Sequence, residues 1–236
     1  MSAAREHESL GGYLELHIEQ GNRLVKARQA IGVVTDIVGI VSDQLTFVGC
    51  ADHAGTTSMQ DRRDAAQGAS AFTVAAREIV MNDFPRGVVN VGKMDFTPGA
   101  FNIVPARVAV SLEFRAPREE ELQRMDAALI DRARDEAKRF ELTLEVKFLG
   151  KHAPTSMSAA AQNAIRAASK GLGLTHLPLT SGAGHDAQNL AAVCPAGMIF
   201  VPSVDGASHS PREFSAWQDC VNGANVLLQS VLRLAA

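Results

Sequence analysis

The stretch Leu14–Gly21, LELHIEQG, indicates how the chain begins to fold. Three aliphatic side chains alternate with two glutamates and His17, and this period of two is typical of a β-strand with one buried face. Gly21 ends the strand and opens a short helix over residues 22–28. The sequence therefore starts with a strand and a helix, the pattern of an α/β protein.

The same pattern returns after Gly150. We expect a helix over residues 158–173, a glycine-rich loop that leads into a helix over 181–193, a buried strand over 197–203, and a last helix from Glu213. The two ends of the chain therefore form one α/β domain, predicted to consist of residues 1–33 and 151–236. One strand and one short helix before residue 34 are too little for a complete parallel sheet, so we expect a partial domain.

The middle of the chain, residues 34–150, has a different order of elements. Its alternating and helical patterns predict β-α-β-β-α-β, the split βαβ or ferredoxin-like arrangement. A strand over 31–39 leads into this unit, and its expected elements then follow in order: strand 44–49, helix 59–81, strands 87–96 and 107–115, helix 118–140 and strand 142–150. This unit is predicted to be inserted into the α/β domain.

Composition excludes several classes of protein. The 236 residues are 46% hydrophobic and 21% charged with a formal charge of −3, and no block of Lys and Arg suggests a nucleic-acid partner. No run approaches the roughly 18 apolar residues of a membrane helix, and the charged leader is unlike a signal peptide. Three widely spaced cysteines are typical of reduced thiols, so we expect a cytoplasmic protein without a membrane partner.

Four of the seven histidines, namely His17, His53, His185 and His209, stand next to small or turn residues, where side chains can approach a ligand. His17 and His209 lie at the tips of elements of the α/β domain, and imidazole is the commonest metal ligand. Two plainer interpretations stay open. His17 could pair with a glutamate on its strand, and His209 could belong to a loop that begins a helix.

Other residues could bind or polarise a substrate. His53 follows a strand and could donate to a developing oxyanion, while Asn102 and Arg115 offer amide and anion donors. A surface ion pair is the alternative for Arg115. The loop SGAGHDA could hold an anionic oxygen on backbone N–H groups. The sequence contains no nucleophile elbow, P-loop or GxGxxG motif.

The segments ELHIEQG, HAGTT, DRRDA, PGAFNIVP, SGAGHDA and SHSPRE occur in this order along nearly the whole chain. Together they resemble the C-terminal part of the M20-type metal-dependent amidohydrolases, in particular N-carbamoyl-L-amino-acid hydrolases, β-ureidopropionases and allantoate amidohydrolases. The resemblance implies a catalytic α/β domain with two divalent metals (Zn, Mn, Ni or Co) and an inserted lid that forms a homodimer.

Site residues carry over by position. The resemblance implies His17 and His209 as metal ligands, with Gln20 beside the metal site. It also implies His53 as the lid histidine that polarises the scissile carbonyl, often in the partner's site. The substrate's carboxylate and amide groups would be bound by Asn102, Arg115 and Gly184, with His185 supporting that loop.

The resemblance predicts hydrolysis of a linear C–N bond in a carboxylate-bearing carbamoyl or ureido substrate, releasing ammonia and CO₂. Ser58 and Glu113 depart from the family's usual Pro and Asp, and Ile40 in place of a polar Gln favours a carbamoyl amino acid over the alternative, allantoate. The remaining metal ligands and the general base are expected upstream of His17. We therefore expect this chain alone to be inactive, and a non-catalytic dimerisation module is the second hypothesis.

Overall fold

The computed structural model describes residues 10–235, and the chain divides into two compact units. The terminal unit consists of Met1–Val38 and Thr155–Ala236, and the central unit of Gly39–Pro154. The borders expected from the sequence, after residues 33 and 150, lie a few residues before these.

The terminal unit is built on a mixed sheet. Within residues 10–235 the sheet has five strands in the order β1-β9-β2-β7, and β8 also pairs with β2. β1 runs parallel to β9 and β2 parallel to β8, whereas β2 is antiparallel to β9 and β7. The elements are β1 (Tyr13–Ile18), α1 (Arg23–Ala27), β2 (Ile31–Ile37), β7 (Thr155–Ser156), α4 (Ala159–Gly171), β8 (His176–Ser181), α5 (Asp186–Leu190), β9 (Ala196–Val201), a 3-10 turn (Val204–Gly206) and α6 (Trp217–Leu234).

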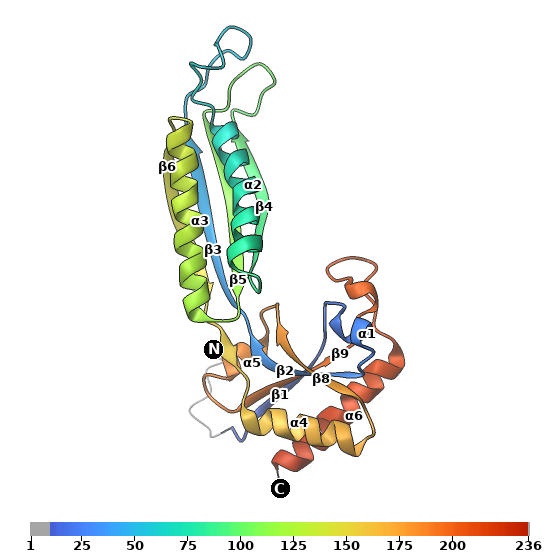
Figure 1. The fold of residues 1–236 in the computed structure, drawn as a ribbon. Coiled ribbons are helices and arrows are strands. Elements are labelled where there is room, and N and C mark those ends of the chain that lie inside the picture. The colour runs from blue at the N-terminus through green and yellow to red at the C-terminus, as the bar shows by residue number, and fades with distance from the viewer. Residues whose placement is uncertain (1–9, 236) are drawn as a thin grey trace, which may run out of the picture. The chain divides into compact units, whose positions relative to one another are not determined.

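Apolar side chains bury both faces of this sheet. All six residues of β9 are buried, with Met198 and Phe200 in one apolar cluster and Ile199 and Val201 in another. Helices α4 and α6 lie together on one side of the sheet (Figure 1). The aliphatic residues of β1 pack on the cluster beneath these helices, as the alternation in LELHIEQG predicts. Glu15 and His17 therefore project from the other face.

The central unit has the predicted order of elements. Its strands β3 (Gly39–Val48), β4 (Val88–Thr97), β5 (Arg107–Ala116) and β6 (Thr143–His152) form an antiparallel sheet in the order β4-β5-β3-β6. Helices α2 (Ala65–Asp83) and α3 (Glu119–Arg139) cover one face and share a single core with it (Figure 1). The other face of the sheet carries mostly polar side chains.

Several predicted element boundaries were wrong, among them the strand expected from residue 44, which begins at Gly39. The helix expected from residue 59 begins at Ala65, because the side chain of Asp64 accepts from the Ala66 amide and caps it. The last helix begins at Trp217 rather than Glu213. His176 begins β8, a strand that was not among the elements expected from the sequence. Pro178 is tolerated there because, in the described residues, β8 pairs on one side only.

None of the helices described between residues 10 and 235 combines the length and apolar character needed to cross a bilayer.

Candidate metal and substrate site

The ends of β1 and β9 lie side by side, because the two strands are parallel and His17 pairs with Phe200. The segments that follow them, residues 19–22 and 202–213, therefore leave the sheet at the same edge. Ligand sites of α/β proteins commonly form at the carboxyl ends of such strands.

The His17 ring is held by the backbone of the next residue. Its Nδ1 lies 2.8 Å from the carbonyl oxygen of Ile18. A carbonyl oxygen only accepts, so Nδ1 carries the hydrogen and the neutral ring keeps its lone pair on Nε2. A backbone carbonyl is a common outer partner of metal-binding histidines. The His17 ring also packs edge-on against that of His185, with 4.7 Å between centroids.

The glutamates that flank His17 have other partners. Both oxygens of Glu19 accept from the first amides of α1, Arg23 at 2.8 Å and Leu24 at 2.9 Å. A Cβ at position 21 would lie 2.8 Å from the Glu19 carboxylate, so Gly21 makes room for this helix cap. Glu15 contacts residues of the SGAGHDA loop.

Gln20 fastens the loop after β9 to the end of β1. Its backbone N–H donates to the Ser203 hydroxyl at 3.0 Å, and its side-chain amide donates to the Ser208 hydroxyl at 3.1 Å. Gln20 and His209 both have positive φ, 57° and 54°, which marks sharp turns at these two positions. The hydrogen bond from Gln20 to Ser208 thereby links the loop that contains His209 to the end of the strand that contains His17.

Glu213 closes the His209 loop through hydrogen bonds to Ser208 and His209. Its Oε2 accepts from the Ser208 hydroxyl at 2.7 Å and from the His209 amide at 3.1 Å. These two hydrogen bonds hold the pKa of Glu213 below its ordinary value, and the charges of His209 and His17 lower it further. The contacts of this carboxylate are with the Ser208 hydroxyl and the backbone of His209.

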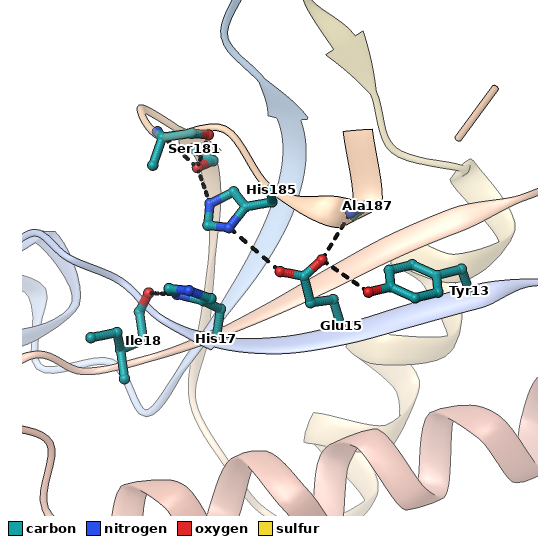
Figure 2. A network of polar contacts seen from close by, with 8 residues as sticks. Tyr13, Glu15, His17, Ile18, Ser181, His185 and Ala187 are labelled. Carbon is teal, nitrogen blue, oxygen red and sulfur yellow. Dashed lines mark hydrogen bonds and ion pairs between the residues drawn. The ribbon is translucent and has the colours of Figure 1, made fainter. Parts of the chain in front are cut away.

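A network of polar contacts lies beside His17 (Figure 2). The His185 ring stands between the Ser181 hydroxyl, 2.8 Å from Nε2, and the Glu15 carboxylate, 3.5 Å from Nδ1. Glu15 also accepts from the Ala187 amide at 2.9 Å and from the Tyr13 hydroxyl at 3.3 Å. Burial alone raises the pKa of Glu15, but the hydrogen bonds from His185 and Ala187 and the histidine charges bring it below its ordinary value.

This network fixes the loop that contains Gly184. The His185 side chain is 3% exposed, so it is better placed to support the loop than to touch a substrate. Ser181 is also buried; its hydroxyl donates to the Ala183 carbonyl at 3.1 Å and accepts from the Ala183 amide at 3.2 Å. Its burial agrees with the absence of a nucleophile elbow in the sequence.

In the central unit, His53 and Asn102 lie close together. His53 forms an isolated β-bridge with Ile103, and the Ala54 amide donates to the Asn102 carbonyl at 3.0 Å. His53 follows β3, and Asn102 lies in the connection between β4 and β5. Two residues far apart in the sequence thus share one end of the sheet.

Arg115 lies near the opposite end of the same sheet. From Arg107, beside the Asn102 loop, to Arg115, β5 covers about 26 Å at roughly 3.3 Å per residue. Arg115 donates to Oε1 of Glu113 through Nε at 2.9 Å and Nη2 at 2.6 Å. The surface ion pair that the sequence offered for Arg115 is therefore present, with Glu113 as its partner. The length of β5 also means that one small molecule could not contact both Arg115 and Asn102 of the same central unit.

The donor atoms suit a divalent metal in part. His17 and His209 offer two imidazole nitrogens, ligands typical of Zn, Ni and Co sites. Among residues 10–235, no three His, Cys, Asp or Glu side chains are grouped closely enough to hold an ion. Two imidazoles alone would not complete a catalytic metal site, which usually has three protein ligands.

Sequence reasoning gave no role in these networks to Ser181 or Glu213. It placed Glu15 on the same face of β1 as His17 and offered a glutamate as the partner of His17, whereas Glu15 contacts His185. Ser181 and Glu213 lie within the motifs SGAGHDA and SHSPRE, but no local pattern reveals their partners, His185 and Ser208.

Proteins with known names and structures have similar sequences and folds. A Geobacillus stearothermophilus protein named N-carbamoyl-L-amino acid amidohydrolase is 40% identical over 233 residues, 99% of this chain and 57% of that protein. An Oryza sativa ureidoglycolate hydrolase is 33% identical over 94% of this chain and 46% of its own length. The Burkholderia multivorans amidase of the hydantoinase/carbamoylase family superposes with a TM-score of 0.88 at 40% identity, over 95% of this chain and 55% of that one.

The chain is therefore a mixed α/β protein with the fold of hydantoinase/carbamoylase-type amidases. It belongs to peptidase family M20/M25/M40, whose model matches residues 1–233. The chain spans about half the length of the curated relatives it matches.

Proposed function

We propose that the chain is part of a metal-dependent amidohydrolase that cleaves an N-carbamoyl-L-amino acid, or a related ureido acid, to ammonia, CO₂ and the amino acid. The observation that carries this proposal is the attachment of the His209 loop to the strand end that bears His17. The 40% identity to a protein named for this reaction supports it.

His17 and His209 would hold divalent metal, with Nε2 of His17 free to bind it. Zn, Mn, Ni or Co would supply Lewis acidity to a water molecule or a carbonyl group when bound. Gln20 lies beside these ligands. We assign the remaining ligands and the general base to the part of the relatives that this chain does not span.

The substrate would be held by its charged and amide groups. Arg115 has the fork of donors that suits a carboxylate, while Asn102 and the Gly184 loop, supported by His185, offer amide donors. His53 would donate a hydrogen bond to the oxyanion of the tetrahedral intermediate.

We further propose a cytoplasmic homodimer formed by the central unit, which would act as a lid. Arg107 stands at the end of β5 that lies near His53 and Asn102, about 26 Å along the strand from Arg115, so one small substrate cannot contact all three residues in one copy. In a dimer, the His53 end of one copy would complete the site of the other.

The test is hydrolysis by a full-length protein, meaning here a protein that joins this chain to the segment of its relatives that the chain does not span. Ammonia release from N-carbamoyl-L-amino acids should require divalent metal, stop with a chelator and return when Mn²⁺ or Zn²⁺ is added. Allantoate and ureidoglycolate are assayed in parallel, and the substrate that is hydrolysed fastest identifies which of the related activities the protein has.

Turnover that is indifferent to chelator would overturn the metal-dependent mechanism. Metal-loaded protein that forms a dimer but turns over none of these substrates would favour the non-catalytic dimerisation module.

A further inference from the structure

The loop after β3 surrounds His53 with backbone donors. The amides of Gly55 and Thr56 both donate to Nδ1 of His53, at 3.0 and 3.2 Å. A ring nitrogen that accepts hydrogen bonds must keep its lone pair, so neutral His53 carries its hydrogen on Nε2. The His53 residue is exposed, so this N–H is available as a donor.

The same loop folds back tightly on the ring. The Thr57 amide donates to the His53 carbonyl at 3.1 Å and closes the turn. A Cβ at position 55 would lie only 3.2 Å from Cε1 of His53, so Gly55 permits the close approach of backbone to imidazole.

Arg62 clamps this turn from the other side. Its Nη2 donates to the Ala54 carbonyl at 2.6 Å, and Nη2 and Nε each donate to the Thr57 carbonyl at 3.1 Å. The Ala54 carbonyl and the Gly55 N–H belong to one planar trans peptide and point in opposite directions. By holding that carbonyl, Arg62 therefore directs the Gly55 N–H toward Nδ1 of His53.

We propose that Arg62 is a positioning residue that fixes His53 as an exposed Nε2–H donor. The catalytic use of this donor rests on the proposed function, in which the Nε2–H of His53 donates to the substrate's oxyanion. The effect of Arg62 on the His53 ring does not depend on that function. The guanidinium acts through the backbone of residues 54–57 and does not touch the substrate. A lysine could not reproduce the fork, since it has a single nitrogen.

The direct test is the tautomer of His53, measured by long-range ¹H–¹⁵N NMR of the 236-residue chain at about pH 8, above the ordinary histidine pKa. Variants Arg62→Ala and Arg62→Lys are compared with Arg63→Ala. Arg63 is a matched control because its Nε donates to the Glu141 carbonyl, away from this turn.

Wild type and Arg63→Ala should show the Nε2–H form alone, whereas both Arg62 variants should show a mixture with the Nδ1–H form. An unchanged tautomer in both Arg62 variants, or the same mixture in Arg63→Ala, would overturn the proposal. Unfolding of the chain by Arg62→Lys would also overturn it, because Arg62 would then serve general stability.

A kinetic measurement on the full-length protein complements the spectrum. Loss of an aligned oxyanion donor lowers kcat, so Arg62→Ala should reduce kcat by about 10-fold or more while KM changes little. A rise in KM at constant kcat would contradict positioning of His53. If wild type has no turnover, the proposed function fails, and the NMR comparison still decides the role of Arg62.

Discussion

At the scale of residues, the polar side chains of β1 and the segment after it serve different structures. Glu15 holds the His185 ring and the start of α5, His17 donates to the carbonyl of Ile18, and Glu19 caps α1. Each side chain has its own hydrogen-bond partner, but Glu15 and His17 both contact the His185 ring, so substitutions at these two positions should both disturb that ring.

The faces of β1 could be predicted because alternation is a local property. The pairing of Glu15 with the Ala187 amide could not, since the two residues are 172 positions apart and meet only in the folded sheet. The same holds for Gln20 and Ser208. Candidate ligands were therefore identifiable from motifs, whereas the contacts that orient them were not.

Arg115→Ala in the full-length protein should lower kcat/KM by an amount equivalent to about 2–4 kcal/mol, because a charged hydrogen-bonded contact to the substrate carboxylate is lost. Steady-state kinetics with an N-carbamoyl-L-amino acid would measure this. Arg107→Ala is the control, since Arg107 is on the same strand and pairs with the exposed Glu145. An unchanged kcat/KM in Arg115→Ala would remove Arg115 from the substrate site.

Asp43 should make the central unit more stable in weak acid. It is 3% exposed, and burial together with the nearby charge of Asp126 raises its pKa to about 6. Since the folded pKa exceeds the unfolded value, protonated Asp43 stabilises the fold. This contribution is complete below about pH 4 and is lost as the pH rises through about 6.

Asp43→Asn should therefore raise the free energy of unfolding at pH 8 by about 1–3 kcal/mol and flatten its dependence on pH between 4 and 7. Urea unfolding at several pH values measures this. The exposed Asp131→Asn serves as the control. A wild-type stability that does not fall over this pH range would contradict the prediction.

At the scale of elements, α4 packs directly on a glycine of β9. A Cβ at Gly197 would lie 2.5 Å from Cβ of Ala161 and 3.0 Å from Cδ2 of Leu14. Gly197→Ala should therefore lower the free energy of unfolding by about 1–3 kcal/mol through overpacking. Gly182→Ala is the control, with nothing within 4 Å of its added Cβ. Equal urea midpoints for the two variants would be inconsistent with this close contact.

The elements differ in how far the sequence could predict them. The β-α-β-β-α-β order follows from strong local periodicity, and the structure has the same order. The start of α2 could not be judged from helical periodicity, because Asp64 caps the helix and α2 begins at Ala65, six residues after its expected beginning. β8 was missed because Pro178 is tolerated only in its tertiary setting, at a sheet edge.

At the scale of the whole molecule, the proposed dimer predicts complementation between inactive variants. Full-length His53→Asn and His17→Ala should each be nearly inactive. Co-expression should restore about one quarter of wild-type activity, because about half of random dimers are mixed and each then has one intact site. Ammonia release by the purified mixture measures this. Absence of restoration despite demonstrated mixed dimers would mean that His53 acts within its own subunit.

The chain passes between the two units at neighbouring points. In the terminal unit Ile37 pairs with Thr155, and in the central unit Ile40 pairs with His152. The folded central unit thus holds its own first and last residues close together. The terminal unit therefore avoids the loss of conformational entropy that closing a flexible loop of this length would cost. In the folding of the terminal unit, the folded central unit therefore joins β2 to β7 as a short hairpin connection would. Such a module could be exchanged for a tight turn without separating β2 from β7.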